Sequence, residues 1–284
     1  MSATAAELAR WESVAPGVVR VPFRRRAVRV LPGVLVAVIT LWVFIHLSLD
    51  PLVIWAGLGR LGWLLAFMVP PAHGGLLGVF LWAMVETLAI ALLATVFAAV
   101  LAIPFGLLCT RSTGVLAPVT FIARRLSDTV RGVDALVWAL IFVNVVGLGP
   151  FAGILALTLH NTGDLAKLYS EAIENIEKRQ LDGIRASGGS PFAVLRLGAL
   201  PQFLPVLTSQ ALYYFESNTR SATIIGAVGA GGIGLLLTER IRLYRWDEVA
   251  FLILMILVAV YAIDAVSQRL RIRLIEGRKA PLVA

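Results

Sequence analysis

Charged residues are scarce in this chain, at 15% of 284 residues, whereas an ordinary soluble domain carries about a quarter. Cysteine occurs once, as Cys109, which excludes an intrachain disulfide framework and a cysteine-rich metal site, and we interpret it as a small buried hydrophobe. Lysine occurs only as Lys167, Lys178 and Lys279, and none of them follows a glycine as the lysine of an ATP-binding P-loop does. The chain is therefore not expected to hydrolyse ATP, and its sequence predicts no metal site.

Apolar residues dominate instead, at 59% of the chain, with a mean hydropathy of +0.87. They fall in continuous runs long enough to cross a bilayer as helices, rather than alternating at every second residue as in a barrel strand. We therefore predict an all-α integral membrane protein surrounded by the lipid bilayer. Roughly six transmembrane helices are expected, at residues 30–49, 76–108, 133–147, 151–169, 201–225 and 248–267.

The predicted spans divide the chain into segments. Residues 1–29 form a cytoplasmic N-terminal arm, and 30–49 form a first transmembrane helix that is retained rather than cleaved as a signal. Residues 50–75, which are rich in glycine, proline and tryptophan, are expected to be an irregular external segment at the membrane interface. The core spans 76–270, with a helix near the cytoplasmic surface at 115–132, and a cytoplasmic tail follows at 271–284.

The net charge of +8 is interpreted as a sign of membrane orientation rather than of nucleic-acid binding. Most of the basic residues fall in the segments that this arrangement places inside the cell, as the positive-inside rule requires. Both termini are therefore predicted to be cytoplasmic. The exceptions concentrate in one predicted external stretch that contains Arg240, Arg242 and Arg245.

The loop at 170–199 is polar, yet it lies between two predicted spans. It runs from a glutamate-rich helical stretch through Leu181 to Pro191 and on to Leu200-Pro201. A short helix that ends in paired glycines and is followed by proline is stiff, and a stiff element transmits rigid-body motion. The alternative interpretation is an ordinary amphipathic connector.

This loop resembles the "EAA" loop of ABC importer permeases. Asp182-Gly183-Ile184, three residues, Gly188, nine residues, Gly198, one residue and Leu200-Pro201 keep the spacing of that pattern, although Asp, Gly-Ile and Gly198 replace its Glu, Ala-Ala and Ile. The resemblance implies a coupling helix that docks in a cleft of a cytoplasmic ATPase. The residues assigned to this coupling are Asp182, Gly183, Arg185, Gly188, Ser190, Pro191, Leu200 and Pro201.

A second stretch, from Tyr214 to Gly234, is similar to the permease subunit of phosphonate ABC importers, and the similarity covers roughly residues 76–270. It implies a type I importer permease in a bacterial plasma membrane. The implied partners are a second copy of the chain, two ABC ATPase subunits that bind ATP and Mg²⁺, and an external solute-binding protein. This chain itself would hold no cofactor, and alternating access would move phosphonate or a related small oxyanion.

Charged and polar residues inside predicted spans are candidates for the translocation pathway, because such residues usually face a cavity or a partner. Glu216 and Arg220 share one helix face, so a plain structural ion pair is the alternative, whereas an arginine in the pathway would suit an oxyanion. The full candidate set is Glu86, His160, Asn161, Glu216, Asn218 and Arg220.

The glycine-rich stretch that follows formally fits a dinucleotide-binding fingerprint, but its flanks are membrane helices instead of a βαβ unit. We interpret it as an outer gate or simply as tight helix packing. The basic residues after it are candidates for docking the binding protein or for a solvated interfacial helix. These gate and docking candidates are Gly229, Gly231, Gly232, Arg240, Arg242 and Arg245.

Three other functions remain open at this stage. The first keeps the ABC permease and changes the cargo to phosphate, methionine or another small solute. The second is an ATPase-independent channel or carrier, which leaves the loop at 170–199 unexplained. The third is a membrane scaffold, which leaves the placement of Glu216 and Arg220 unexplained.

Overall fold

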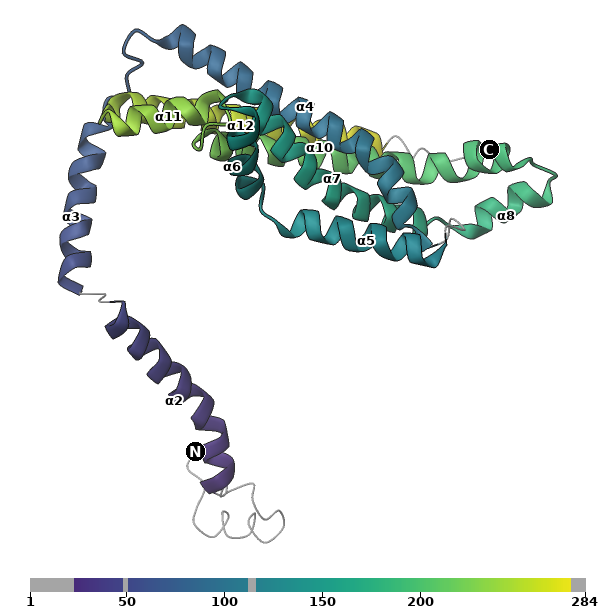
Figure 1. Cartoon of the computed structure of the whole chain (residues 1–284), viewed down its shortest axis with the longest axis horizontal. Helices are drawn as coiled ribbons and strands as arrows, with labels where there is room; N and C mark the ends of the chain where they lie inside the picture. The colour runs from purple at the N-terminus through teal and green to yellow at the C-terminus, as the bar shows by residue number, and fades with distance from the viewer. Residues whose placement is uncertain (1–22, 48–50, 112–115, 277–284) are drawn as a thin grey trace, which may run out of the picture. The chain divides into compact units, whose positions relative to one another are not determined.

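The computed structural model describes residues 23–47, 51–111 and 116–276, and every regular element in these ranges is a helix (Figure 1). The chain divides into two compact units, residues 1–66 and 67–284. The predicted all-α fold class is confirmed. The predicted arm at 1–29 lies largely outside the described residues, as does the end of the tail beyond residue 276.

The first unit contains α2 (Phe23–His46) and nearly all of α3 (Pro51–Phe67). The expectation of an irregular segment over 50–75 is wrong for residues 51–67, which form one apolar helix. Each of the three glycines in α3 weakens a helix by about 1 kcal/mol relative to alanine in water. In an apolar stretch the balance changes, because a helix satisfies its own backbone hydrogen bonds where lipid offers none.

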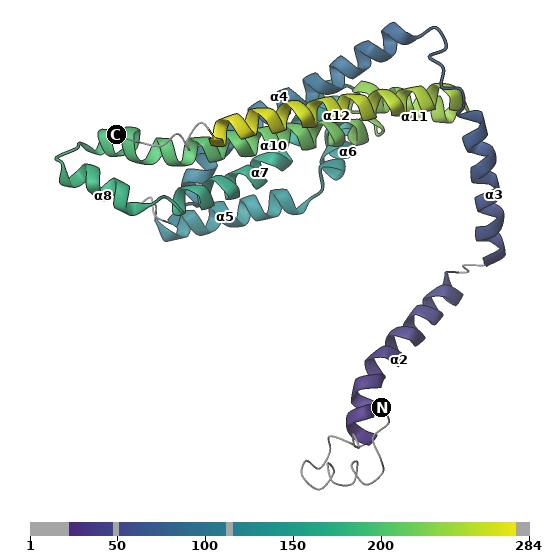
Figure 2. The same ribbon diagram turned by 180° about the vertical axis from the view of Figure 1, so that it is seen from behind.

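The second unit is a bundle of long helices. In chain order it contains α4 (Leu77–Cys109), α5 (Ala117–Gly132), α6 (Ala135–Val146), α7 (Pro150–Glu174), α8 (Lys178–Ala186), α9 (Pro191–Ala193), the π-helical η2 (Val194–Ala199), α10 (Leu200–Gly226), α11 (Gly232–Arg242) and α12 (Trp246–Glu276). Helices α4, α7, α10 and α12 run alongside one another, with α8 at one end of the unit and α11 at the other (Figures 1 and 2).

Three stretches of the described chain are long and apolar enough to cross a membrane: 77–109, 191–226 and 246–273. Helices α5 and α6 form a fourth candidate as a broken pair, bent by 86°. The prediction that 133–147 crosses alone is therefore wrong, because the 12 residues of α6 reach only about 18 Å across a core of about 30 Å.

Small residues allow the central helices to approach closely. Ala91, Ala94, Ala98 and Ala102 follow one face of α4 and are fully buried, chiefly against α7. A β-carbon added to Gly163 of α7 would lie 2.9 Å from a backbone oxygen of α5. Close backbone approach through small side chains is how helices pack in lipid, where apolar burial supplies little drive for association.

Candidate functional site

Helix α8 and the turn after it, residues 178–190, form a short projecting element, which we call the α8 element. None of the residues of α8 is fully buried. The helix ends in a Schellman motif: the N–H of Gly188 donates to the carbonyl of Arg185 at 3.0 Å, and the N–H of Gly189 donates to that of Ile184 at 3.0 Å. Gly188 has φ of +82°, which glycine adopts at little cost.

The chain then turns back along α8. The Ser190 hydroxyl accepts a hydrogen bond from the N–H of Ala193 at 3.2 Å, and Pro191 follows at the first helical position. A β-carbon on Gly198 would lie 2.7 Å from Cδ2 of Leu181, so the glycine at this position lets η2 lie close to α8. The turn after α8 is thus held by the Schellman motif where it begins and by the Ser190 cap where it ends.

Leu200-Pro201 explains the π-helix before α10. Proline lacks an N–H, and its ring clashes with the carbonyl four residues earlier. The preceding turn widens accordingly, and the N–H of Leu200 bonds to the carbonyl of Leu195, five residues back. Among the predicted coupling residues, Asp182 and Arg185 pair at 3.0 Å on the exposed side of α8. Their coupling role stays a prediction.

A cavity of about 320 Å³ opens between the start of α6, α7 and α10. Of the predicted pathway residues, His160, Asn161 and Asn218 line it, whereas Glu86, Glu216 and Arg220 do not. We call it the central pocket. Its other lining residues are Asp134, Ala135, Leu136, Leu157, Asp164, Tyr213, Tyr214, Ser217, Ser221, Ile224 and Ile225.

Buried amides organise the wall of the central pocket. The Asn161 amide donates to the Asn218 carbonyl oxygen at 2.8 Å, and the Asn218 amide donates to the Thr95 hydroxyl of α4 at 2.8 Å. Both asparagines are 2% exposed, so these hydrogen bonds join α4, α7 and α10 without water. His160 lies 3.0 Å through Nδ1 from the carbonyl oxygen of Val133, and its Nε2 lies 3.8 Å from Asp164.

The lining of the central pocket is polar, but no arginine or lysine belongs to it within the described residues. Its two carboxylates are already engaged: Asp134 accepts the N–H of Leu136 at 2.8 Å, and Asp164 lies 4.0 Å from Arg131. The hydroxyl groups of Tyr213, Ser217 and Ser221 remain to contact a polar solute. The sequence signal that identifies part of this wall is the helical spacing of Tyr214, Asn218 and Ser221 on α10, which the search for charged residues missed.

The intramembrane charges form a separate network between α10 and α12. Arg220 lies 3.5 Å from both Glu216 and Asp264, so the proposed i,i+4 pair is present. Arg271 also reaches Glu216, at 3.1 Å. This arginine belongs to the predicted tail at 271–284, but α12 continues to Glu276 and packs it against α10. Whether Arg220 also contacts solute stays a prediction.

The glycine-rich stretch is packed against two other parts of the unit. Gly229 accepts a hydrogen bond from the N–H of Gly149 at 2.9 Å. Glu86 accepts the N–H of Gly232 at 2.9 Å, and the Thr87 hydroxyl accepts that of Ile233 at 2.8 Å. Glu86 is thus placed as a cap of α11. A β-carbon on Gly231 would lie 2.9 Å from the nitrogen of Pro150, which explains a glycine there.

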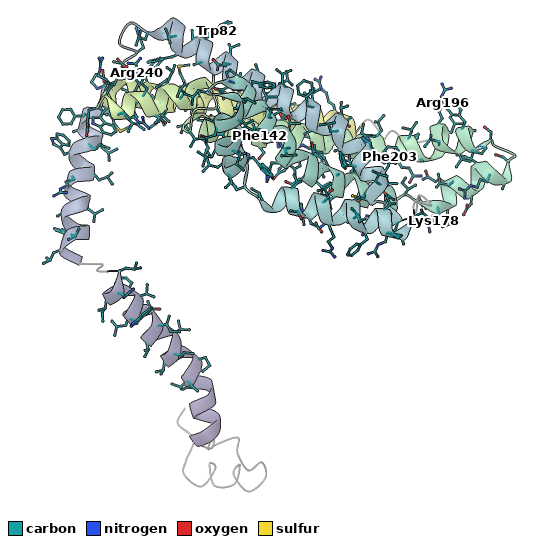
Figure 3. The ribbon with its side chains drawn as sticks, in the orientation of Figure 1. Trp82, Phe142, Lys178, Arg196, Phe203 and Arg240 are labelled. Atoms are coloured by element: carbon teal, nitrogen blue, oxygen red, sulfur yellow. The ribbon has the colours of Figure 1, made fainter. Side chains whose placement is uncertain are left out.

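Arg240 and Arg242 in the last turn of α11, and Arg245 just after it, differ in their surroundings. Arg240 and Arg245 lie 3.2 and 2.6 Å from the carboxylate of Glu248, which is 1% exposed. Arg242 is exposed. Figure 3 shows Arg240 at the α11 end of the second unit, opposite Lys178 and Arg196 at the α8 end. Two of the three predicted docking arginines therefore serve a buried carboxylate, and docking by any of them stays a prediction.

Several known proteins are similar to this chain in sequence or in fold. The family model described as binding-protein-dependent transport system inner membrane component matches residues 102–276. The phosphite transport system permease protein PtxC of Stutzerimonas stutzeri is 35% identical over 78% of this chain and 81% of its own length. The phosphate-import permease protein PhnE of Mycolicibacterium smegmatis is 38% identical over 89% of this chain, which spans 48% of that longer relative.

Among solved structures, a chain of the MetNI methionine ABC transporter in an inward-facing conformation matches with a TM-score of 0.62 at 24% identity. The match covers 72% of this chain and 99% of that chain, and at this identity it shows the fold alone. The resemblance found in the sequence is therefore confirmed at the level of the family. The chain belongs to the inner-membrane components of binding-protein-dependent transport systems, as a multi-pass bacterial inner-membrane protein with the fold of a type I ABC importer permease.

Proposed function

We propose that this chain is the permease subunit of an ATP-driven importer for phosphonate or a related small oxyanion. The observation that carries the proposal is the α8 element, a capped and exposed helix that matches the spacing of an ATPase-coupling loop. Two relatives named for phosphite and phosphate transport support the solute class.

In this proposal the α8 element couples ATP hydrolysis to movement of the permease. Proteins of this family work with an ATPase and a binding protein. Here ATP and Mg²⁺ are bound by two copies of a separate ATPase, and this chain holds no cofactor. Closure of the ATPases moves the α8 element, and η2 and α10 follow because α8 packs on η2, which continues directly into α10. A flexible loop would absorb such a displacement.

The solute passes the central pocket. The hydroxyl groups of Tyr213, Ser217 and Ser221 can donate hydrogen bonds to oxyanion oxygens, and such neutral donors bind an anion without trapping it as a fixed cation would. A homodimer supplies two such pockets and two α8 elements, which matches two ATPase subunits.

The α8 end faces the cytoplasm and the α11 end faces the binding protein. Basic residues support this direction, because α8 itself contains Lys178, Arg179 and Arg185, and Arg196 lies at the same end of the unit (Figure 3). The end of α12 then lies on the cytoplasmic side, and a cytoplasmic N-terminus is a separate part of the proposal. Arg242, the exposed arginine of the α11 end, is the docking candidate that carries no ion pair among the described residues.

Reconstitution tests the proposal. The permease is purified from native membranes with its associated subunits and placed in liposomes with the binding protein. We expect an ATPase to co-purify, and we expect phosphonate, phosphite or phosphate to stimulate ATP hydrolysis while methionine does not. If methionine alone stimulates ATP hydrolysis, the transported solute is methionine and not an oxyanion. Absence of any co-purifying ATPase would contradict the importer assignment.

Two substitutions separate the pathway from the fold. Ser221→Asp places a carboxylate at a half-buried position in the lining of the central pocket, so it should lower oxyanion uptake at least tenfold through like-charge repulsion. Arg269→Gln, on the exposed face of α12, is the control and should transport as the wild type does. Equal uptake by both variants would show that the solute does not pass through the central pocket.

A further inference from the structure

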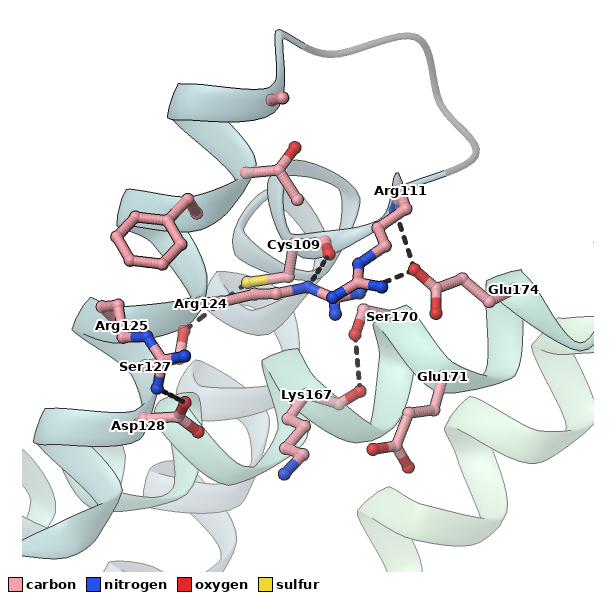
Figure 4. A pocket seen from close by; sticks show the side chains of 13 residues that line it. Cys109, Arg111, Arg124, Arg125, Ser127, Asp128, Lys167, Ser170, Glu171 and Glu174 are labelled. Atoms are coloured by element: carbon pink, nitrogen blue, oxygen red, sulfur yellow. Dashed lines mark hydrogen bonds and ion pairs between the residues drawn. The ribbon is translucent and has the colours of Figure 1, made fainter.

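A second and larger cavity, of about 620 Å³, lies at the α8 end of the unit, separate from the central pocket. It is enclosed by the end of α4, the first half of α5 and the last turns of α7 (Figure 4). We call it the basal pocket. Its size is within the range of small-molecule sites, about 300–1,000 Å³. Four of its lining residues are basic: Arg111, Arg124, Arg125 and Lys167.

Two of these four cations are already neutralised. Arg124 donates to the backbone carbonyl of Cys109 at 2.6 Å and to Glu174 at 2.7 Å, and Glu174 also accepts the N–H of Arg111. Arg125 lies 3.6 Å from Asp128, and its guanidinium group lies 5.3 Å from the centre of the Phe121 ring. These contacts account for two of the three carboxylates in the lining.

The side chains of Arg111 and Lys167 carry no ion pair among the described residues, and neither does the third carboxylate, Glu171. The basal pocket therefore has a surplus of one positive charge. Arg111, Lys167 and Glu171 are exposed residues, so the attraction of this surplus for an anion should weaken as the salt concentration rises.

We propose that the basal pocket binds a phosphate-type oxyanion group, with Arg111 and Lys167 as its cationic partners. The group can come from a free oxyanion in the cytoplasm or from the headgroup of an anionic lipid. The cytoplasmic placement rests on the orientation proposed above, whereas binding itself depends only on the lining residues.

Occupancy bears on coupling because of where the basal pocket lies. The Arg124–Glu174 pair joins α5 to the last residue of α7, and α8 begins at Lys178. An anion beside Arg124 competes with Glu174 for the guanidinium group. The site is therefore placed to change how firmly the α8 element is held.

Equilibrium binding tests the proposal on the intact complex of permease and ATPase, in nanodiscs of uncharged phosphatidylcholine, with radiolabelled inorganic phosphate as the probe. The double variant Arg111→Gln/Lys167→Gln should bind at least tenfold more weakly, because each lost charge-assisted hydrogen bond alone is worth about tenfold. Glu171→Gln should bind several-fold more tightly, since it removes a repelling charge. Arg196→Gln, outside the pocket, is the matched control and should bind as the wild type does.

A lipid source is separated by native mass spectrometry of the complex purified from membranes that contain phosphatidylglycerol. If one phosphatidylglycerol is retained per chain and is lost in the double variant, the site binds a lipid headgroup. This result supports the proposal even if free phosphate does not bind. Opposite shifts in phosphate affinity for the double variant and Glu171→Gln support it with a free oxyanion.

The proposal is overturned if neither ligand binds, or if both variants bind as the wild type does. Binding that disappears in Ser221→Asp and persists in the double variant would also overturn it, because the phosphate would then occupy the central pocket. Failure of solute-stimulated ATP hydrolysis would contradict the proposed import function and leave this binding result unaffected.

Discussion

Gly188 provides the sharpest test of the α8 element, because its substitution changes the backbone and little else. It occupies the left-handed position after α8, with φ of +82°, and a β-carbon built there meets no atom within 4 Å. Gly188→Ala therefore adds backbone strain without a steric clash. Gly183→Ala, within α8 and in equally open surroundings, is the matched comparison, because it restores the alanine that the resembled coupling loop carries at this predicted coupling position.

The expected magnitudes have opposite signs. An L-residue in the left-handed conformation costs about 1–2 kcal/mol, so Gly188→Ala should lower the ratio of capped to frayed helix about 5- to 30-fold. Gly183→Ala removes a glycine from a helix interior and should stabilise α8 by about 0.5–1 kcal/mol. Gly188→Pro adds a further loss, because the N–H that bonds to Arg185 disappears.

Hydrogen exchange and transport should report these changes together. The amides of residues 188 and 189 should lose protection in Gly188→Ala, and solute moved per ATP hydrolysed should fall in the reconstituted complex. Both quantities should stay at or above wild-type values in Gly183→Ala. Unchanged transport in Gly188→Ala, with protection lost as expected, would refute the claim that a rigid α8 element is needed for coupling.

Three further predictions concern stability, each measured as the shift in Tm of the purified protein. Gly234→Ala places a β-carbon against a backbone carbonyl of α10 and should destabilise the protein by about 1–3 kcal/mol, whereas Gly62→Ala, in open surroundings within α3, should not. Arg271→Ala leaves a half-buried carboxylate of α10 with one cation fewer and should cost about 1–3 kcal/mol, while Arg269→Ala on the exposed face should stay within about 0.5 kcal/mol. Glu248→Gln leaves two arginines beside a buried neutral amide and should cost about 3–5 kcal/mol; a loss below about 1 kcal/mol would mean that water reaches this cluster.

Local sequence patterns predict the helical elements well where one periodic signal dominates. The apolar runs of α4 and α12 are long and uninterrupted, and both were expected as spans. The paired glycines at 188 and 189 and the proline at 191 predict the end of α8 and the start of α9, because each residue type has one inexpensive backbone role there. The α3 helix was missed because its glycines and tryptophans were interpreted as interfacial irregularity.

The roles of charged residues were harder to predict. A charged residue in an apolar segment indicates a desolvation cost, but it does not indicate which residue compensates that cost. Glu86 lies 146 residues from the backbone amide that it accepts, and Arg271 lies 55 residues from Glu216. Nothing in the spacing of these residues indicates such contacts. Arg240 and Arg245 were interpreted as docking residues or as part of a solvated interfacial helix. Their ion pairs with Glu248 could not be predicted, because the burial of this carboxylate is decided by the packing around it.

The sequence by itself determined that this chain is a helical membrane protein and that residues 181–201 carry the spacing of a coupling loop. Both properties depend on local composition and backbone chemistry, which each segment holds whatever its neighbours are. Only the tertiary structure decided that His160, Asn161 and Asn218 share one pocket while Glu216 and Arg220 bind each other and α12. Such sets are assembled by the packing of α4, α6, α7 and α10, and contacts between distant segments follow from three-dimensional proximity rather than from chain order.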